Sequence, residues 1–151
     1  MNSYIMYAAL AGIAWGLGGF FEKTGLHELK LPPIAGITIR TTVALIILGS
    51  LSVPAWKNIE NPSNLKAWLM IAIGGGVIAG SLGMWSFYSA LSLTENLGIT
   101  LAIAFAFSPI AGTVTGLIHG SQKIDIKTGL GMAAIIIGIV LIQLAHEPAA
   151  Q

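Results

Sequence analysis

Long apolar stretches separated by short polar ones run along the whole chain. Each comes close to the roughly 20 residues that a helix needs to cross the hydrocarbon core of a bilayer. The stretches cover residues 4–21, 31–53, 67–93, 97–118 and 129–145. The residues left over are enough only for two tails and four connections. The pattern therefore predicts an all-α fold, a polytopic membrane bundle of five transmembrane helices that forms one domain over residues 1–151.

The ends of the predicted helices are assigned from charged residues and prolines. Glu22 and Lys23 close the first stretch, and Pro32 and Pro33 suit the first turn of the second helix, where a missing N–H costs little. As an α-helix with a rise of about 1.5 Å per residue, the third stretch would be roughly 40 Å long. We therefore expect this helix to tilt in the bilayer or to end early.

Composition excludes a soluble protein. Hydrophobic residues make up 55% of the chain and charged residues 9%, whereas soluble domains average about 25% charged residues. The mean hydropathy is +0.84. A net charge of +1 provides no basic surface for nucleic acid, so we expect no nucleic-acid partner. We therefore expect the chain to lie in the lipid bilayer.

Lysines in the connections predict the orientation, because cytoplasmic loops carry the excess of basic residues. Lys57, Lys66, Lys123 and Lys127 fall on the side of the N-terminus, and Lys23 and Lys30 fall on the opposite side. This difference places the N-terminus in the cytoplasm and the C-terminus outside. The bias is small, and it is compatible either with a single orientation or with insertion in both orientations, as an antiparallel pair of identical chains requires.

Arg40 is the most informative single residue, because it lies near the middle of the apolar stretch 31–53. A cation at the centre of a membrane helix costs about 2.5–3.5 kcal/mol on insertion scales, so it should face the protein interior or a wet cavity. Two interpretations remain open. Arg40 binds an anionic group of a substrate, or it pairs with Glu22, with Glu95 or with backbone carbonyls.

A polar and aromatic stripe follows one face of the third predicted helix. It comprises Ser81, Trp85, Tyr88 and Ser92, at intervals of four, three and four residues. An interfacial aromatic belt is one interpretation, favoured for Tyr88, and the wall of a substrate cavity is the other, favoured for Trp85. Trp15, inside the first helix, is a second candidate for a cavity wall.

Ser108 and Pro109 interrupt the fourth predicted helix. Proline cannot donate a backbone hydrogen bond, and a break of this kind persists in a membrane only where it faces protein or water. The kink is either part of a permeation pathway or purely structural.

Glycines spaced by four allow close helix packing in three helices. They are Gly12 and Gly16, Gly76 and Gly80, and Gly112, Gly116 and Gly120.

Enzymatic and metal-binding functions find little support. His27, His119 and His146 lack the spacing of metal ligands, and the chain contains no Cys. No nucleophile, base and acid fall at a common depth in the predicted helices. We therefore predict no catalytic residues, no metal site and no cofactor.

Short motifs occur in all five predicted helices in a defined order. They are Ala14-Trp15-Gly16 and Glu22-Lys23-Thr24-Gly25-Leu26 in the first, Arg40 in the second, Phe87-Tyr88-Ser89-Ala90-Leu91 in the third, Ser108-Pro109 in the fourth, and Gly129 to Gly138 in the fifth. In order and spacing the chain resembles one EamA-type domain of the drug/metabolite transporter superfamily. It departs from that family after the fourth helix, where His119-Gly120-Ser121-Gln122 replaces a frequent Gly-Glu.

The resemblance implies an assembly of two halves. Most relatives contain two five-helix halves of opposite orientation, and this chain has a single half. It therefore implies a homodimer, antiparallel or otherwise paired, or association with a second similar membrane subunit. Inverted repeats of this kind enclose a midplane site, and alternating access rocks one repeat against the other.

These observations lead to the hypothesis of a small secondary transporter, an exporter of a metabolite or drug-like solute, in a prokaryotic cytoplasmic (inner) membrane. The predicted substrate-binding residues are Trp15, Arg40, Trp85, Tyr88, Ser108 and Pro109, and Glu22 and Glu95 are the candidates for ion coupling. The alternative is a structural or accessory subunit of a larger membrane complex that does not transport. The glycine pairs, the few intramembrane charges and the absent family Glu all fit that alternative.

Overall fold

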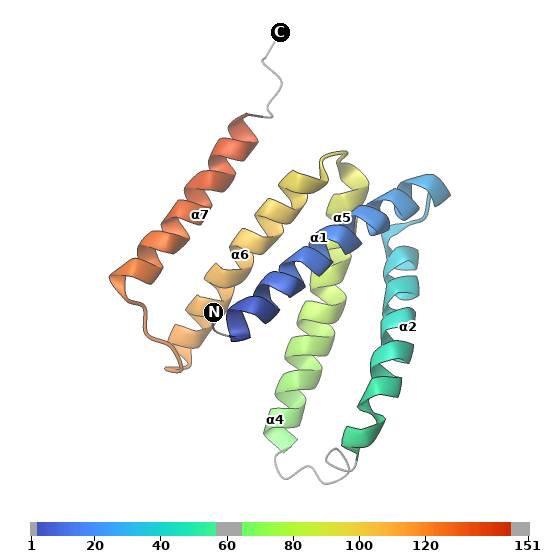
Figure 1. The fold of residues 1–151 in the computed structure, drawn as a ribbon, viewed down its shortest axis with the longest axis horizontal. Coiled ribbons are helices and arrows are strands. Elements are labelled where there is room, and N and C mark those ends of the chain that lie inside the picture. The colour runs from blue at the N-terminus through green and yellow to red at the C-terminus, as the bar shows by residue number, and fades with distance from the viewer. Residues whose placement is uncertain (1–2, 57–64, 146–151) are drawn as a thin grey trace. The chain divides into compact units, whose positions relative to one another are not determined.

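The computed structural model describes residues 3–56 and 65–145 as helices joined by short connections (Figure 1). The elements are α1 (Ser3–Leu29), α2 (Pro33–Ser52), the 3-10 turn η1 (Val53–Ala55), α4 (Leu65–Leu69), the π-helical segment η2 (Met70–Gly83), α5 (Met84–Leu93), α6 (Leu97–Ile118) and α7 (Ile126–Leu144). Within these ranges five helices are long and apolar enough to cross a membrane, and there is no strand. The predicted fold class is confirmed.

The first helix is longer than predicted. The predicted end at Phe21 is wrong, because α1 continues through Glu22 and Lys23 to Leu29. It stops at Lys30, which has a left-handed φ of 50°, while the Leu31 N–H donates to the Leu26 carbonyl oxygen at 3.1 Å. This pattern is a Schellman end, which satisfies carbonyl groups that the helix itself leaves unpaired. Pro32 and Pro33 then start α2, two residues later than predicted.

The third span neither ends early nor remains an α-helix. It runs without a break from Leu65 to Leu93, and its glycine-rich middle, Met70–Gly83, makes i→i+5 hydrogen bonds. The Ser81 hydroxyl follows the same pattern and donates to the Gly76 carbonyl oxygen, five residues earlier, at 3.1 Å. A Cβ atom on Gly80 would lie 2.9 Å from the Gly75 carbonyl oxygen. Glycine is therefore required at position 80 for this wide helix.

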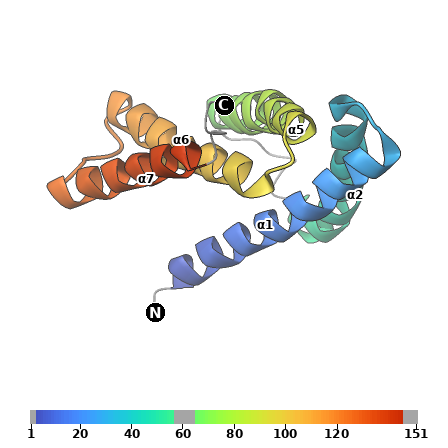
Figure 2. The ribbon, with the colours of Figure 1, turned by 90° about the horizontal axis from the view of Figure 1, so that it is seen from above.

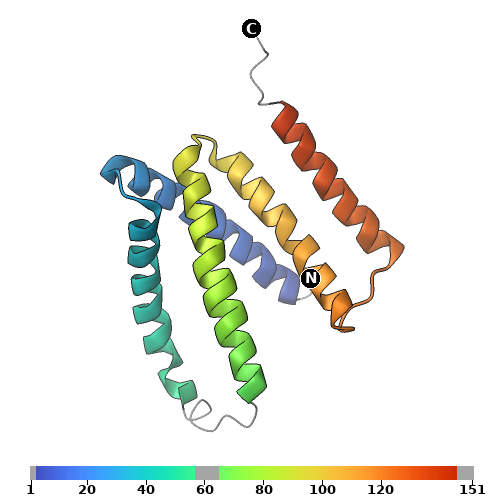
Figure 3. The ribbon, with the colours of Figure 1, turned by 180° about the vertical axis from the view of Figure 1, so that it is seen from behind.

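The chain divides into two units, and the first extends to Glu95. Within it, α2 runs antiparallel to the α4–η2–α5 span and packs against α5, and α1 also contacts α5 (Figures 1 and 3). The buried apolar side chains of this unit are Leu26 on α1, Ile37 on α2, and Tyr88 and Leu91 on α5. Leu26 belongs to the C-terminal part of α1, whereas the N-terminal half of α1 projects away from α2 and α5 (Figure 2).

The second unit begins at Asn96 and contains the antiparallel helices α6 and α7, which pack against each other (Figure 3). The Asn96 side chain caps α6 by accepting a hydrogen bond from the Ile99 N–H at 3.2 Å. The helix continues through Pro109 and ends at Ile118, two residues before Gly120, whose φ of +68° favours glycine. The predicted fourth span, 97–118, is confirmed, and the fifth begins three residues earlier than predicted, at Ile126.

The start of α7 depends on the ionisation of Asp125. Its carboxylate accepts a hydrogen bond from the Thr128 N–H at 2.7 Å. Hydrogen bonds from the Thr128 side chain and backbone lower the pKa of the Asp125 carboxyl below its ordinary value. A lowered carboxyl pKa contributes stability above the unfolded-state value of about 3.9, and this contribution is lost as the pH falls through the folded-state pKa.

We therefore expect Asp125→Ala to lower the Tm of the detergent-solubilised protein at about pH 7, and this difference from the wild type to shrink below about pH 4. Thermal unfolding followed by circular dichroism measures both. Asp125→Asn is the control, because its side-chain oxygen can still cap the helix but does not titrate. The difference in Tm between Asp125→Asn and Asp125→Ala should therefore be the same at both pH values. An Asp125→Ala loss that stays constant with pH would contradict the assignment.

Candidate functional site

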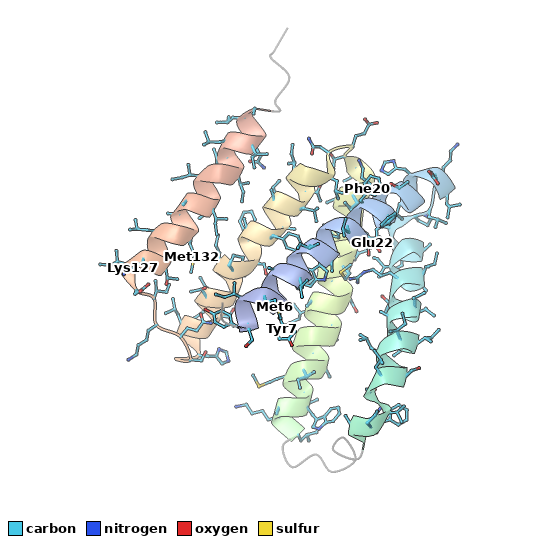
Figure 4. All side chains as sticks on the ribbon, viewed as in Figure 1. Met6, Tyr7, Phe20, Glu22, Lys127 and Met132 are labelled. Atoms are coloured by element: carbon cyan, nitrogen blue, oxygen red, sulfur yellow. The ribbon has the colours of Figure 1, made fainter. Side chains whose placement is uncertain are left out.

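An ion pair joins α1 and α2 within the first unit. The Arg40 Nε atom lies 2.7 Å from the Glu22 Oε1 atom. The exposed fractions of the two side chains are 37% and 20%, so both are partly covered by protein. Figure 4 shows Glu22 on the part of α1 that crosses α5. Of the two interpretations left open for Arg40, the structure contains the pairing with Glu22.

The pair lies inside the spans. Arg40 follows Pro33 by seven residues and Glu22 precedes Leu29 by seven residues, which places each about 10 Å from the connected ends of α1 and α2. Because the second span is Pro33–Ala55, Arg40 is about four residues, or roughly 6 Å, short of its middle. A charge at this depth requires a partner, and the longer α1 supplies one, since Glu22 is helical and not part of a loop.

Tyr88 on α5 is the third member of the cluster. It is 1% exposed, and it interacts electrostatically with both Glu22 and Arg40. The expectation of an interfacial aromatic residue is wrong for Tyr88, because the ring is enclosed by protein. Glu22, Arg40 and Tyr88 therefore bring one acidic, one basic and one phenolic side chain together from three helices.

Gly36 allows this convergence. A Cβ atom at position 36 would lie 2.6 Å from Leu26 Cδ2 and 2.9 Å from Tyr88 Cε1. Gly36 precedes Arg40 by one turn of α2, and Leu26 follows Glu22 by one turn of α1, so each helix presents one charge and one packing position on the same face. The missing side chain leaves a slot for the tyrosine ring, which we call the Gly36 slot.

Two further contacts fix α1 against the C-terminal end of α5. Lys23 Nζ donates a hydrogen bond to the Glu95 backbone oxygen, and His27 Nε2 lies 3.2 Å from the Leu91 backbone oxygen. Cations and N–H donors near a helix C-terminus satisfy carbonyl groups that have no partner inside the helix. These two contacts occur one turn apart on α1 and hold the Glu22-bearing part of the helix in place.

The other predicted site residues have different surroundings. The side chains of Trp15 on α1 and Trp85 on α5 are 56% and 52% exposed. Glu95 enters the first unit through its backbone oxygen, and its residue is exposed. Ser108 and Pro109 are exposed on α6 in the second unit.

Sequence reasoning missed Gly36, Leu26, Lys23 and His27. The signal that finds the first two is a one-turn spacing: Gly36 lies four residues before Arg40 and Leu26 four residues after Glu22. Lys23 and His27 share the same spacing with each other. No local signal shows that they contact α5, because Leu91 and Glu95 are distant in the sequence.

A metal site has no support in the part of the chain that the structure describes, where no three His, Cys, Asp or Glu side chains are grouped to hold an ion.

Comparison with known proteins gives one positive result: the model of the EamA-like transporter family matches residues 2–144. Neither a curated protein nor a solved structure matches the chain significantly.

We expect the ion pair to contribute measurably to stability. Arg40→Gln and Glu22→Gln each leave one charge without its partner in a partly covered site. We expect each to cost about 1–3 kcal/mol of unfolding free energy, between the values for exposed and buried pairs. Unfolding by sodium dodecyl sulfate in mixed micelles measures the loss.

The double variant removes both charges, so we expect it to recover most of the loss of either single variant. Lys123→Gln in the exposed α6–α7 connection is the control and should stay within about 0.5 kcal/mol of the wild type. Simple addition of the two single losses in the double variant would show that the side chains are not coupled.

Proposed function

The chain belongs to the EamA-like transporter family, and from this we propose that it is a small secondary transporter that exports a metabolite or drug-like solute across a prokaryotic inner membrane. It is an integral membrane protein with five apolar helices, and its family is one of transporters, not of enzymes. The solute, the direction and the mechanism described below are the content of the proposal.

The observation that carries the proposal is the Glu22–Arg40 pair beside Tyr88. Ionisable residues inside membrane helices are costly, and they mark pathways for substrates, ions or protons. Arg40 Nε lies 2.7 Å from Glu22 Oε1, and the Arg40 side chain is 37% exposed. A guanidinium has five N–H donors, more than one carboxylate can use, and the proposal is that an anionic group of the solute binds to others.

The remaining binding residues are proposed on their exposure. Trp15 and Trp85 are more than half exposed, and they are proposed to contact the apolar part of the solute. Ser108 and Pro109, exposed on α6, are proposed to shape the solute path. Glu22 is the stronger candidate for coupling to a proton or another ion, because its carboxylate lies inside the span whereas Glu95 follows the end of α5.

A dimer is proposed as the working unit, in antiparallel or otherwise paired form. Transporters of this type place their solute site between two repeats, and the five spans described above correspond to one repeat. Gly12, Gly16 and Gly112 have no other atoms within 4 Å of the position of a Cβ, so their helix faces are open to a neighbouring helix. The small lysine bias fits insertion in both orientations. Lys57, which contributes to that bias, lies outside the described residues.

One observation favours the alternative of an accessory subunit. Arg40 is neutralised by Glu22 of the same chain, as expected for a pair that only stabilises the fold. The two functions differ in the effect of a charge swap. Exchanging the two charges as Glu22→Arg with Arg40→Glu preserves a purely structural pair but moves the cation away from the place where a solute would meet it.

We expect liposomes containing the wild-type protein to accumulate at least one member of a panel of radiolabelled amino, carboxylate and phosphorylated metabolites. Arg40→Ala and the charge-swapped double variant should reduce the initial rate at least tenfold, because both remove the cation from position 40. Lys123→Gln is the matched control and should transport normally. Wild-type rates in a folded Arg40→Ala variant would remove Arg40 from the solute site, whereas failure of the wild-type protein to move any member of the panel would favour the accessory function.

Orientation can be tested because the chain contains no Cys, so a single introduced thiol is unambiguous. Ser121→Cys lies in the exposed α6–α7 connection. If chains insert in both orientations, about half of these thiols should react with a membrane-impermeant maleimide from outside intact cells, and the rest only after lysis. Reaction exclusively before or exclusively after lysis would contradict the antiparallel homodimer.

A further inference from the structure

The third span changes from one helical type to another along its length, and this change has a mechanical consequence. We propose that η2 (Met70–Gly83) is a conformational device that exchanges between a π form and an α form, and that the exchange turns and shifts α4 relative to α5. The proposal goes beyond the transport function and does not depend on it, because it concerns the backbone of a single span.

A hinge inside a membrane span must keep its backbone groups paired, because an N–H or C=O group without a partner costs several kcal/mol in the hydrocarbon core. An interrupted helix fails this requirement wherever it faces lipid. A change from i→i+5 to i→i+4 hydrogen bonds meets it, since each N–H exchanges one backbone carbonyl for the next. The number of residues in each turn changes, so the two ends of the segment rotate and shift relative to each other.

Serine side chains report the hydrogen-bond register along this span. In α5 the Ser86 hydroxyl donates to the Leu82 carbonyl oxygen, four residues earlier, at 3.0 Å, which is the usual acceptor for serine in an α-helix. In η2 the Ser81 hydroxyl instead donates to the Gly76 carbonyl oxygen, five residues earlier, at 3.1 Å. Ser81 therefore adds a side-chain hydrogen bond that is specific to the π form.

The two forms are separated by small changes of the backbone. Gly83, the last residue of η2, has a φ of −61° and a ψ of −45°, and Leu69, which precedes η2, has −63° and −36°. All four angles are ordinary for an α-helix. Gly80 is the position that admits the π form, because a Cβ there would lie 2.9 Å from the Gly75 carbonyl oxygen, a backbone atom that cannot rotate away as a side chain can. A methyl group at position 80 therefore favours the α form.

The third span is anchored at its α5 end. α5 packs against α1 and α2, and its Tyr88 and Leu91 side chains are buried. Neither α4 nor η2 contains a buried residue, and among the described residues the main contacts of η2 are with α4 and α5 of the same span. Conversion of η2 therefore leaves α5 in place and moves the α4 end.

Spin labels on Lys66→Cys in α4 and Leu93→Cys at the end of α5 measure the length of the span, because the chain has no Cys of its own and both positions are exposed. An all-α span places the two positions about 40 Å apart, and the π form is shorter because each turn takes up more residues. We expect pulsed electron paramagnetic resonance of the full chain in lipid nanodiscs to show two distances. Gly80→Ala should leave only the longer one.

Matched variants separate this effect from a general change in helix propensity. Gly74→Ala introduces the same methyl group into the same segment, but its Cβ meets nothing within 4 Å, so both distances should remain. Ser81→Ala removes the hydrogen bond specific to the π form. It should raise the ratio of the longer to the shorter distance at least about twofold, as the modest net value of one hydrogen bond implies, whereas Ser86→Ala should not.

A single distance in the labelled protein without further substitutions would overturn the proposal, because η2 would then hold only one form. Two distances that Gly80→Ala leaves in their original proportion would overturn it as well, since the π form would not depend on Gly80. Should Gly80→Ala fail to fold, the serine variants decide in its place, and equal proportions in Ser81→Ala and Ser86→Ala would then reject the exchange.

Discussion

The need to neutralise one cation inside a membrane span organises the first unit of this protein. Arg40 lies about 10 Å from the start of α2, at a depth where an unpaired charge is costly. Its partner, Glu22, is available because α1 remains helical past Phe21 and ends only at Leu29. The length of α1 serves this requirement, because it keeps Glu22 in a helix that packs beside α2. Tyr88 completes the cluster from α5.

The same cluster links the fold to the proposed activity. Its charged members are half-buried beside the fully buried apolar side chains of the unit, and its glycine makes room for an aromatic ring where two helices meet. Lys23 and His27 attach α1 to the end of α5, so the acidic residue is held from two directions. Most large apolar side chains, by contrast, lie on the surface of the described residues, as expected for helices that face lipid or another subunit.

Much of this architecture could be predicted from the sequence, and the remainder could not for physical reasons. The length of apolar runs is a local property, so the five spans and the exceptional position of Arg40 could be recognised directly. Which acid pairs with Arg40 depends on how three helices pack, and the sequence left Glu22, Glu95 and backbone carbonyls as alternatives. Tyr88 and Trp85 share a predicted face, yet only Tyr88 is buried, because Gly36 admits it. The π-helical segment was missed, since glycine-rich apolar sequence is also compatible with an ordinary membrane helix.

Solid-state NMR of the protein in phospholipid bilayers tests the central ion pair most directly. Labelling with ¹⁵N-arginine yields the signals of a single guanidinium, that of Arg40, and ¹³C-labelled glutamate reports the carboxylates. The account predicts dipolar coupling between the Arg40 guanidinium and a glutamate carboxylate carbon, and loss of that coupling in Glu22→Gln. Coupling of the guanidinium to phosphorus of the lipid headgroups, unchanged by Glu22→Gln, would show that Arg40 leaves the bundle and would contradict the account.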